Sequence, residues 1–209
     1  MNYTLLVCSL MLAYLLGSVP SAVWIGKWFY DIDVRKEGSG NAGATNTIRV
    51  LGLKAGIPVL LIDAFKGWLA VALAGWMAAG ILSTENLILF RIGAGAIAVL
   101  GHVFPAFAGF RGGKGVATLV GVVIALYWQA FILVLIWFAI VFAITRYVSL
   151  ASVTSALIFP FIVLFVFHEQ SAPLIVLAFL VAVFIPITHR RNIGRLIRGE
   201  ENKLEFKKK

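Results

Sequence analysis

The sequence predicts an all-α, polytopic membrane protein, because its composition is apolar, its apolar residues form long runs, and its basic residues lie between and after those runs. Of the 209 residues, 61% are hydrophobic and 13% are charged, and the mean hydropathy is +0.99. A soluble domain carries about a quarter charged residues, so lipid must solvate much of this surface. No linker or low-complexity segment divides the chain, and we expect one domain over residues 1–209.

The candidate membrane helices are seven apolar runs, at about residues 3–25, 56–80, 87–107, 116–128, 130–145, 148–167 and 173–188. The first run has no basic residue before it and is longer than the apolar part of a signal peptide, so we expect it to remain as a helix. A membrane helix needs about 20 residues, and the fourth and fifth runs are short. Joined into one span, they would put the basic C-terminus opposite the other basic loops. We therefore expect a hairpin at Trp128 and Gln129, about seven transmembrane helices, an outside N-terminus and a cytoplasmic C-terminus.

The net charge of +9 follows the positive-inside rule and does not predict nucleic-acid binding. In this topology nearly all basic residues are cytoplasmic, except Lys66 inside a helix and Arg91 near the outer face. The outer loops, at residues 83–85 and 168–170 and at the hairpin, are very short. A site for a soluble substrate is therefore expected on the cytoplasmic side.

The first polar segment, residues 38–49, is rich in glycine and in neutral hydrogen-bonding side chains. Glycines allow turns whose backbone N–H groups face inward and bind anions. The segment contains a G-x-G-x-x-G pattern, but a membrane helix precedes it where a dinucleotide fold needs a strand, so we reject dinucleotide binding. It is either a plain polar loop or an anion site, and the candidate ligands are Ser39, Asn41, Asn46 and Arg49.

The second segment, residues 101–118, contains two glycines followed by a lysine, as in a phosphate loop. It is not a P-loop, because Ala108 and Gly115 replace the first glycine and the Ser/Thr of that motif. The same physics still applies: Gly112 and Gly113 let a phosphate approach the backbone, Lys114 neutralises it, and a helix starts near residue 116. His102 lies about one turn before a proline, and a lone histidine is more often structural than catalytic.

The third segment, residues 189–200, is basic and amphipathic, which fits either a tail lying on anionic lipid or a substrate-binding element. His189 and Asn192, spaced i, i+3, would share one helical face. Asp63 and Lys66 have the same spacing inside the second apolar run. They form either a structural ion pair or a mixed site in which Lys66 reaches an anion.

No metal site or cofactor is expected, because the three histidines are scattered and Cys8 lies near the outer face. The H-x-x-x-x-D arrangement of many acyltransferases is also absent. The residues five positions after the histidines are Phe107, Pro173 and Gly194.

Together, the three segments resemble the motifs of the bacterial acyl-phosphate:glycerol-3-phosphate acyltransferases, the PlsY family, which look like GSGNxGATNxxR, GHxFPxFxxFxGGKGVAT and HRxNIxRLxxGxE. The resemblance covers the whole chain in order, with one departure at Glu200, directly after Gly199. It implies transfer of an acyl chain from acyl phosphate to the 1-hydroxyl of glycerol 3-phosphate. The products would be lysophosphatidate and phosphate, and the place would be the cytoplasmic face of the bacterial inner membrane.

The resemblance also implies roles for individual residues. The glycerol-phosphate side is expected to use Ser39, Arg49, Lys114, His189 and Asn192. The acyl-phosphate side is expected to use Asn41, Asn46, Lys66 and the backbone of Gly112 and Gly113. The catalytic candidates are Ser39, Lys114 and His102.

For the mechanism we expect direct transfer without an acyl-enzyme, with either His102 or a substrate phosphate oxygen taking the proton, and we favour the phosphate. The partners expected are the two substrates and membrane lipid, with no nucleic acid, and the chain is expected to be monomeric. The alternatives are a transporter of a phosphorylated anion, which short neutral outer loops disfavour, and a lipid phosphatase.

Overall fold

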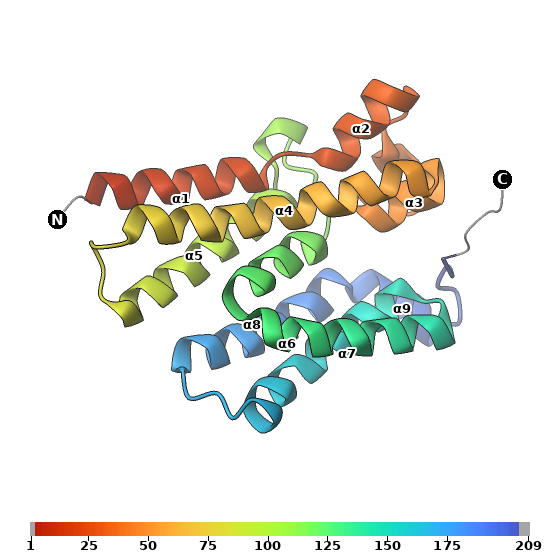
Figure 1. The fold of residues 1–209 in the computed structure, drawn as a ribbon. Coiled ribbons are helices and arrows are strands. Elements are labelled where there is room, and N and C mark those ends of the chain that lie inside the picture. The colour runs from red at the N-terminus through yellow and green to blue at the C-terminus, as the bar shows by residue number, and fades with distance from the viewer. Residues whose placement is uncertain (1–2, 205–209) are drawn as a thin grey trace. The chain divides into compact units, whose positions relative to one another are not determined.

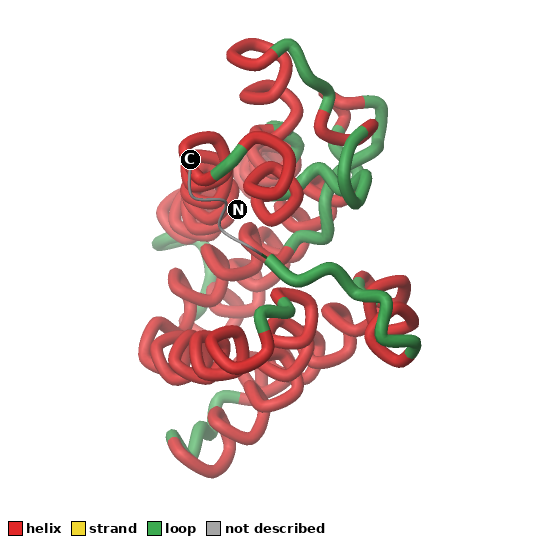
Figure 2. Tube along the Cα trace, turned by 90° about the vertical axis from the view of Figure 1, so that its right-hand side faces the viewer, coloured by secondary structure: helices red, strands yellow, loops and turns green. Residues whose placement is uncertain are grey.

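The structure is a computed structural model that describes residues 3–204, and within that range every regular element is helical (Figures 1 and 2). The all-α expectation is therefore confirmed. The chain forms two compact units, one ending at Leu126 and the other beginning at Tyr127. The expectation of one functional domain is a separate matter and stays a prediction.

The first unit contains α1 (Tyr3–Gly17), α2 (Ser21–Tyr30), α3 (Ala44–Leu51), α4 (Leu53–Ala78), α5 (Thr84–Val103) and the beginning of α6 (Val116–Thr145). Short 3₁₀ turns lie at Val34–Lys36 and Ala106–Ala108. Helices α1, α4 and α5 pack against one another (Figure 1). Their shared core consists largely of buried alanines, namely Ala13, Ala70, Ala74, Ala94 and Ala98.

Small residues bring these helices into backbone contact. A methyl group on Gly17 of α1 would overlap the carbonyl of Ala98 in α5. Likewise, one on Gly67 of α4 would overlap the carbonyl of Thr118 in α6. Lipid gives apolar helices little reason to associate, so close van der Waals packing of this kind is what holds them together. These contacts fix the parts of α4 and α5 that carry the polar residues described below.

The first apolar run is not one continuous helix, which corrects the sequence expectation. Helix α1 ends at Gly17, α2 begins at Ser21, and the two are bent by 42°. Pro20 at the break has no N–H to donate and cannot continue the helical ladder. The bend leaves the Val19 carbonyl available to a side chain from another helix.

Helix α6 is interrupted close to the predicted hairpin. Tyr127 has non-helical angles, with φ −153° and ψ 63°, one residue before Trp128. Within residues 3–204, four helices are long and apolar enough to span a membrane, or six if each of two bent pairs counts as one span. The count of seven, the reversal at the break and the orientation of the termini stay predictions.

The second unit contains the remainder of α6, α7 (Val148–Phe161), a π-helical stretch at Ile162–Val166, α8 (Ala172–Thr188) and α9 (Arg190–Ile197). Helices α7 and α8 pack together, and α9 contacts both. After α9 the chain returns to the start of α7, where the Leu204 N–H donates to the Arg146 carbonyl over 2.9 Å. This return segment carries a carboxylate that is central to the unit.

Both units expose large apolar side chains, as a membrane protein must. Trp76 on α4 and Ile144 on α6 are 76% and 77% exposed. Many leucine, isoleucine, valine and phenylalanine side chains on the other long helices are also exposed. In water such a surface would aggregate, whereas in a bilayer it faces lipid. The chain is a multi-pass membrane protein, as expected.

Cysteine labelling tests the predicted topology. In a Cys8→Ser background, Ser83→Cys and Gln170→Cys should react with an impermeant maleimide in intact cells, because both positions are exposed on predicted outer loops. Lys54→Cys and Asn202→Cys, also exposed, should react only after the cells are lysed. External labelling of Asn202→Cys would mean that the number of spans is even and that α6 does not turn back at Tyr127.

Candidate active site

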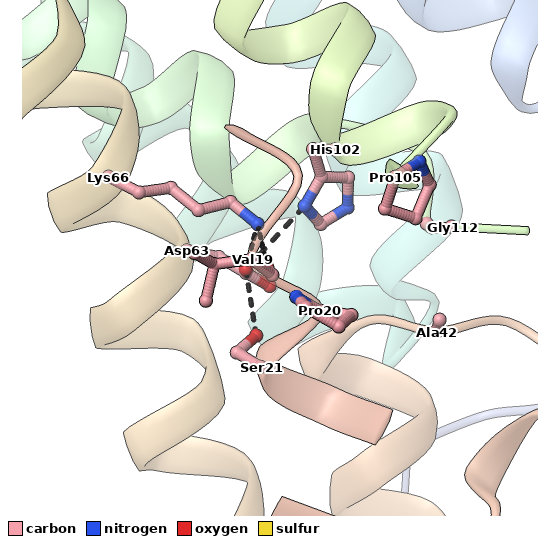
Figure 3. A pocket seen from close by; sticks show the side chains of 10 residues that line it. Val19, Pro20, Ser21, Ala42, Asp63, Lys66, His102, Pro105 and Gly112 are labelled. Atoms are coloured by element: carbon pink, nitrogen blue, oxygen red, sulfur yellow. Dashed lines mark hydrogen bonds and ion pairs between the residues drawn. The ribbon is translucent and has the colours of Figure 1, made fainter. Parts of the chain in front are cut away.

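A buried cluster of charged and polar side chains lies at the centre of the first unit (Figure 3). The Asp63 Oδ1 atom of α4 accepts hydrogen bonds from Ser21 Oγ over 2.8 Å and from Lys66 Nζ over 2.7 Å. The same oxygen lies 3.5 Å from Nδ1 of His102 on α5. Asp63, Lys66 and His102 are exposed by only 1%, 4% and 6%. The cluster therefore joins three elements inside the protein.

Lys66 is largely committed to structure. The i, i+3 spacing brings its ammonium group to Asp63, and the bend between α1 and α2 offers the Val19 carbonyl as a second acceptor at 2.8 Å. Two of its three hydrogens are thus bound within the protein. The structure gives Lys66 the ion pair that was one of the two interpretations, and its binding of acyl phosphate stays a prediction.

The pairing of His102 with Asp63 was missed in the sequence. A search for an acid five residues after each histidine finds none, because the acid comes from a neighbouring helix earlier in the chain. The available signal was that both are polar residues within neighbouring apolar runs. Helices α4 and α5 pack against each other, so the two side chains meet.

The glycine loop after α5 is folded back onto the end of that helix. The Gly113 N–H donates to the His102 carbonyl over 3.2 Å, and the Gly112 N–H donates to the Val103 carbonyl over 3.1 Å. These donors satisfy carbonyls that the helix end leaves open. The N–H groups of both glycines are therefore used within the protein, and contact of this backbone with acyl phosphate stays a prediction.

The same loop requires glycine because of close approach. A methyl group on Gly112 would overlap the His102 carbonyl, and one on Gly113 would overlap His102 Nε2 and come within 2.9 Å of the Ala42 carbonyl. The first and second glycine-rich segments therefore meet. A small cavity lies where they meet, and its lining includes Ala42, Asp63, Lys66, His102, Gly112 and Gly113.

Asn46 organises the first glycine-rich segment from within. It is 2% exposed, its Nδ2 donates to the carbonyls of Val34 and Glu37 over 2.8 and 3.1 Å, and its Oδ1 accepts from the Ser39 N–H over 2.8 Å. Gly38, with φ 59°, makes the turn that this arrangement needs. Asn46 thus holds the loop, and its contact with acyl phosphate stays a prediction.

The other sequence candidates of this unit are accessible. Ser39 is exposed at the tip of the loop that Asn46 holds. The remaining three are half-buried on the two segments or on α3, namely Asn41, Arg49 and Lys114. Asn41 and Lys114 therefore each lie next to a residue that lines the cavity, whereas Arg49 lies on α3, which contributes no lining residue.

Arg35 ties the two loops together, a role that sequence reasoning did not assign. Its Nε and Nη2 bind the two oxygens of Asp33 over 2.9 and 2.8 Å, and its Nη1 donates to the Ala108 carbonyl over 2.8 Å. The hydrogen bond from Arg35 lowers the pKa of Asp33 to about 2. Such a bidentate pair is both stronger and more directional than a single contact.

The second unit has its own polar cluster around Glu201. This carboxylate accepts hydrogen bonds from Asn192 over 2.6 Å, from Arg195 over 2.7 Å and from Ser149 over 2.9 Å. Burial raises the pKa of Glu201, but these three donors outweigh burial and hold it below the usual value. His189, 3% exposed, places Nδ1 2.9 Å from the Ile185 carbonyl. His189 lies between α8 and α9, Asn192 lies in the first turn of α9, and the shared helical face expected from their spacing stays a prediction.

Glu201 also corrects the sequence comparison. The final motif ends in G-x-E, and with Gly199 as its glycine the glutamate is Glu201, whereas Glu200 fills the variable position. The departure seen at Glu200 therefore does not exist. Within residues 3–204, no three His, Cys, Asp or Glu side chains lie close enough together to hold a metal ion.

Comparisons with known proteins agree on one family. A sequence model described as glycerol-3-phosphate acyltransferase matches residues 7–199. The chain is 42% identical over 199 residues to the glycerol-3-phosphate acyltransferase of Fusobacterium nucleatum, covering 95% of this chain and 98% of that one. It is 45% identical over 208 residues to that of Enterococcus faecalis, covering 96% and 93%.

Two solved structures are also similar. The crystal structure of PlsY, an integral membrane glycerol 3-phosphate acyltransferase, in its glycerol 3-phosphate form matches with a TM-score of 0.85 and 35% identity over 96% of each chain. The lysophosphatidic acid form of that enzyme matches with a TM-score of 0.81 and 33% identity over 96% of each chain.

The Asp33–Arg35 pair predicts a specific dependence of stability on pH. Folding lowers the pKa of Asp33 from 3.8 to about 2, so the pair stabilises the fold fully above about pH 4 and progressively less as pH falls toward 2. Asp33→Asn keeps a capping side chain but removes the charge. The variant should melt at a lower temperature than the parent at pH 6, with a difference that narrows below pH 4. A difference that stays constant from pH 6 to pH 2.5 would contradict the assignment.

Proposed function

The chain belongs to the glycerol-3-phosphate acyltransferase family, and from that membership we propose that its acyl donor is an acyl phosphate and that its active site faces the cytoplasm. Its activity is the acylation of glycerol 3-phosphate in phospholipid synthesis. The observation that carries this conclusion is the family match over residues 7–199, together with a similar structure that exists in a glycerol 3-phosphate form.

The geometry of the first unit supports two phosphate-bearing substrates. Its two glycine-rich segments meet at Ala42 and Gly113, and Arg35 links them at a second point. Arg49 and Lys114 supply positive charge on these adjoining elements. A lipid donor with a phosphate head and a soluble phosphorylated acceptor both require such charge near the membrane surface.

The reaction joins the glycerol 3-phosphate hydroxyl oxygen to the acyl carbonyl carbon and breaks the bond from that carbon to the phosphate oxygen. The hydroxyl proton passes to a phosphate oxygen, and inorganic phosphate leaves. A phosphate oxygen necessarily lies next to the reacting carbonyl, whereas His102 is buried, and both points support this proton route over a route through the imidazole. Phosphate is a good leaving group, so no acyl-enzyme is needed.

The residue assignments follow from the family motifs. We assign binding of glycerol 3-phosphate to Ser39, Arg49, Lys114, His189 and Asn192, and the acyl-phosphate side to Asn41, Asn46, Lys66 and the backbone of Gly112 and Gly113. Asn46 and Lys66 also make hydrogen bonds within the protein, so they help to shape the site. His189 and Asn192 belong to the second unit, where Glu201 orients Asn192.

The cellular location that we propose follows from the distribution of basic residues along the chain. The polar segments of the site carry the basic residues that the positive-inside rule puts in the cytoplasm. We therefore place the enzyme in the bacterial inner membrane, with both substrates bound from the cytoplasmic side or sideways from the bilayer.

Lys114→Ala tests the phosphate site. Losing one charged hydrogen bond costs about 1.5–3 kcal/mol, which is roughly a 10- to 150-fold loss of kcat/KM. Lys114→Arg should restore little, because a guanidinium is larger and has different donor geometry. Lys54→Ala removes an exposed lysine outside the site and serves as the matched control. Normal activity of Lys114→Ala would place the phosphate elsewhere.

The choice of donor tests the proposal directly. Purified protein should turn over palmitoyl phosphate with glycerol 3-phosphate but not palmitoyl-CoA or palmitoyl-acyl carrier protein. The glycine-rich segments suit a small phosphate group, and no histidine is followed five residues later by an aspartate. Lysophosphatidate formation from either thioester, with phosphotransacylase excluded, would refute the acyl-phosphate assignment.

A further inference from the structure

Asp63 occupies a position that the reaction as described does not use. It is 1% exposed, and its Oδ1 meets groups from α2, α4 and α5 (Figure 3). A buried carboxylate in a membrane protein is costly and is seldom kept without a function. Lys66 alone would suffice to pair its charge, so the further contact with His102 calls for a separate explanation.

His102 stands between Asp63 and the glycine loop. Its Nδ1 lies 3.5 Å from Asp63 Oδ1, while its Nε2 is so close to Gly113 that a methyl group there would overlap it. The backbone of His102 is bound to the same loop, since its carbonyl accepts from the Gly113 N–H over 3.2 Å. Gly113 thus packs on both the side chain and the main chain of His102, and Lys114 is the next residue in the chain.

We propose that Asp63 is a positioning residue for acyl transfer: it fixes the imidazole of His102, on which Gly113 packs, and thereby sets the place of Lys114 at the substrate phosphate. A carboxylate beside Nδ1 favours the tautomer with its hydrogen there and holds the ring plane. Small displacements of a positioned group cost much of its catalytic effect. The inference rests on the proposed role of Lys114 and adds a buried support behind it.

A purely structural ion pair makes a different prediction. If Asp63 only stabilised the helix bundle, its loss would lower the melting temperature and act independently of His102. If Asp63 acts through His102, its removal should matter only while the imidazole is present. A double-mutant cycle separates these cases, because residues that act through each other are not additive.

The experiment compares Asp63→Asn, His102→Ala and the double variant in detergent, with melting temperature, kcat and both KM values measured. The parent protein is assayed first with palmitoyl phosphate, and its inactivity would refute the proposed function rather than this inference. Asp63→Asn should lose at least about tenfold in kcat/KM in the parent and much less in the His102→Ala background. Asp31→Asn, at an exposed helix end, is the matched control and should stay active. Equal losses in both backgrounds, or full activity of Asp63→Asn, would overturn the proposal.

A second pair of variants probes the contact from the loop side and decides the matter if Asp63→Asn does not fold. Gly113→Ala should lower kcat/KM, because its methyl group displaces either the imidazole or the loop. The same substitution should cost much less when His102 is alanine. A harmless Gly113→Ala, or an undiminished cost without the imidazole, would show that His102 does not set the loop and would overturn the proposal.

Discussion

The central constraint on this protein is that a charge buried among apolar helices must be paired. Asp63 meets that constraint with hydrogen bonds from Ser21 and Lys66, and His102 Nδ1 lies 3.5 Å from the same oxygen. The first apolar run bends at Pro20, directly before Ser21. The bend brings Ser21 to the carboxylate and offers the Val19 carbonyl to Lys66. Asp63 and Lys66 of α4 therefore bind the start of α2 by hydrogen bonds, which fix the position of α2 before the loop that follows it.

The glycine contacts act on the same elements. Gly17 and Gly67 have no side chain to keep the helices apart. The backbone of Gly17 therefore contacts Ala98, and that of Gly67 contacts Thr118. These contacts hold α5 against α1 and the first part of α6 against α4. Asn46 and Arg35 complete the arrangement by hydrogen bonds to loop carbonyls. Contacts between helices and hydrogen bonds to loop carbonyls thus together fix the conformation of the loops.

Much of the fold, and the family to which the chain belongs, could be predicted from composition, charge and the order of the motifs. All three can be read directly from the sequence. What the sequence hid was contact between distant residues. Nothing local pairs Asp63 with His102, or Arg35 with Ala108, because packing of α4 against α5 and of one loop against another creates those contacts. The conformation of the glycine loop was hidden for a related reason, because glycine permits several backbone turns. Only the neighbouring carbonyls show that the N–H groups of Gly112 and Gly113 return onto the end of α5.

Glu201 has a consequence for how the protein is made. Ser149, Asn192 and Arg195 all precede it in the chain, so the ribosome delivers these donors before the carboxylate that joins them. The second unit can reach its final form only when the segment after α9 returns to Arg146. A chain that ended before Glu201 would therefore leave Ser149, Asn192 and Arg195 without the one acceptor that they share.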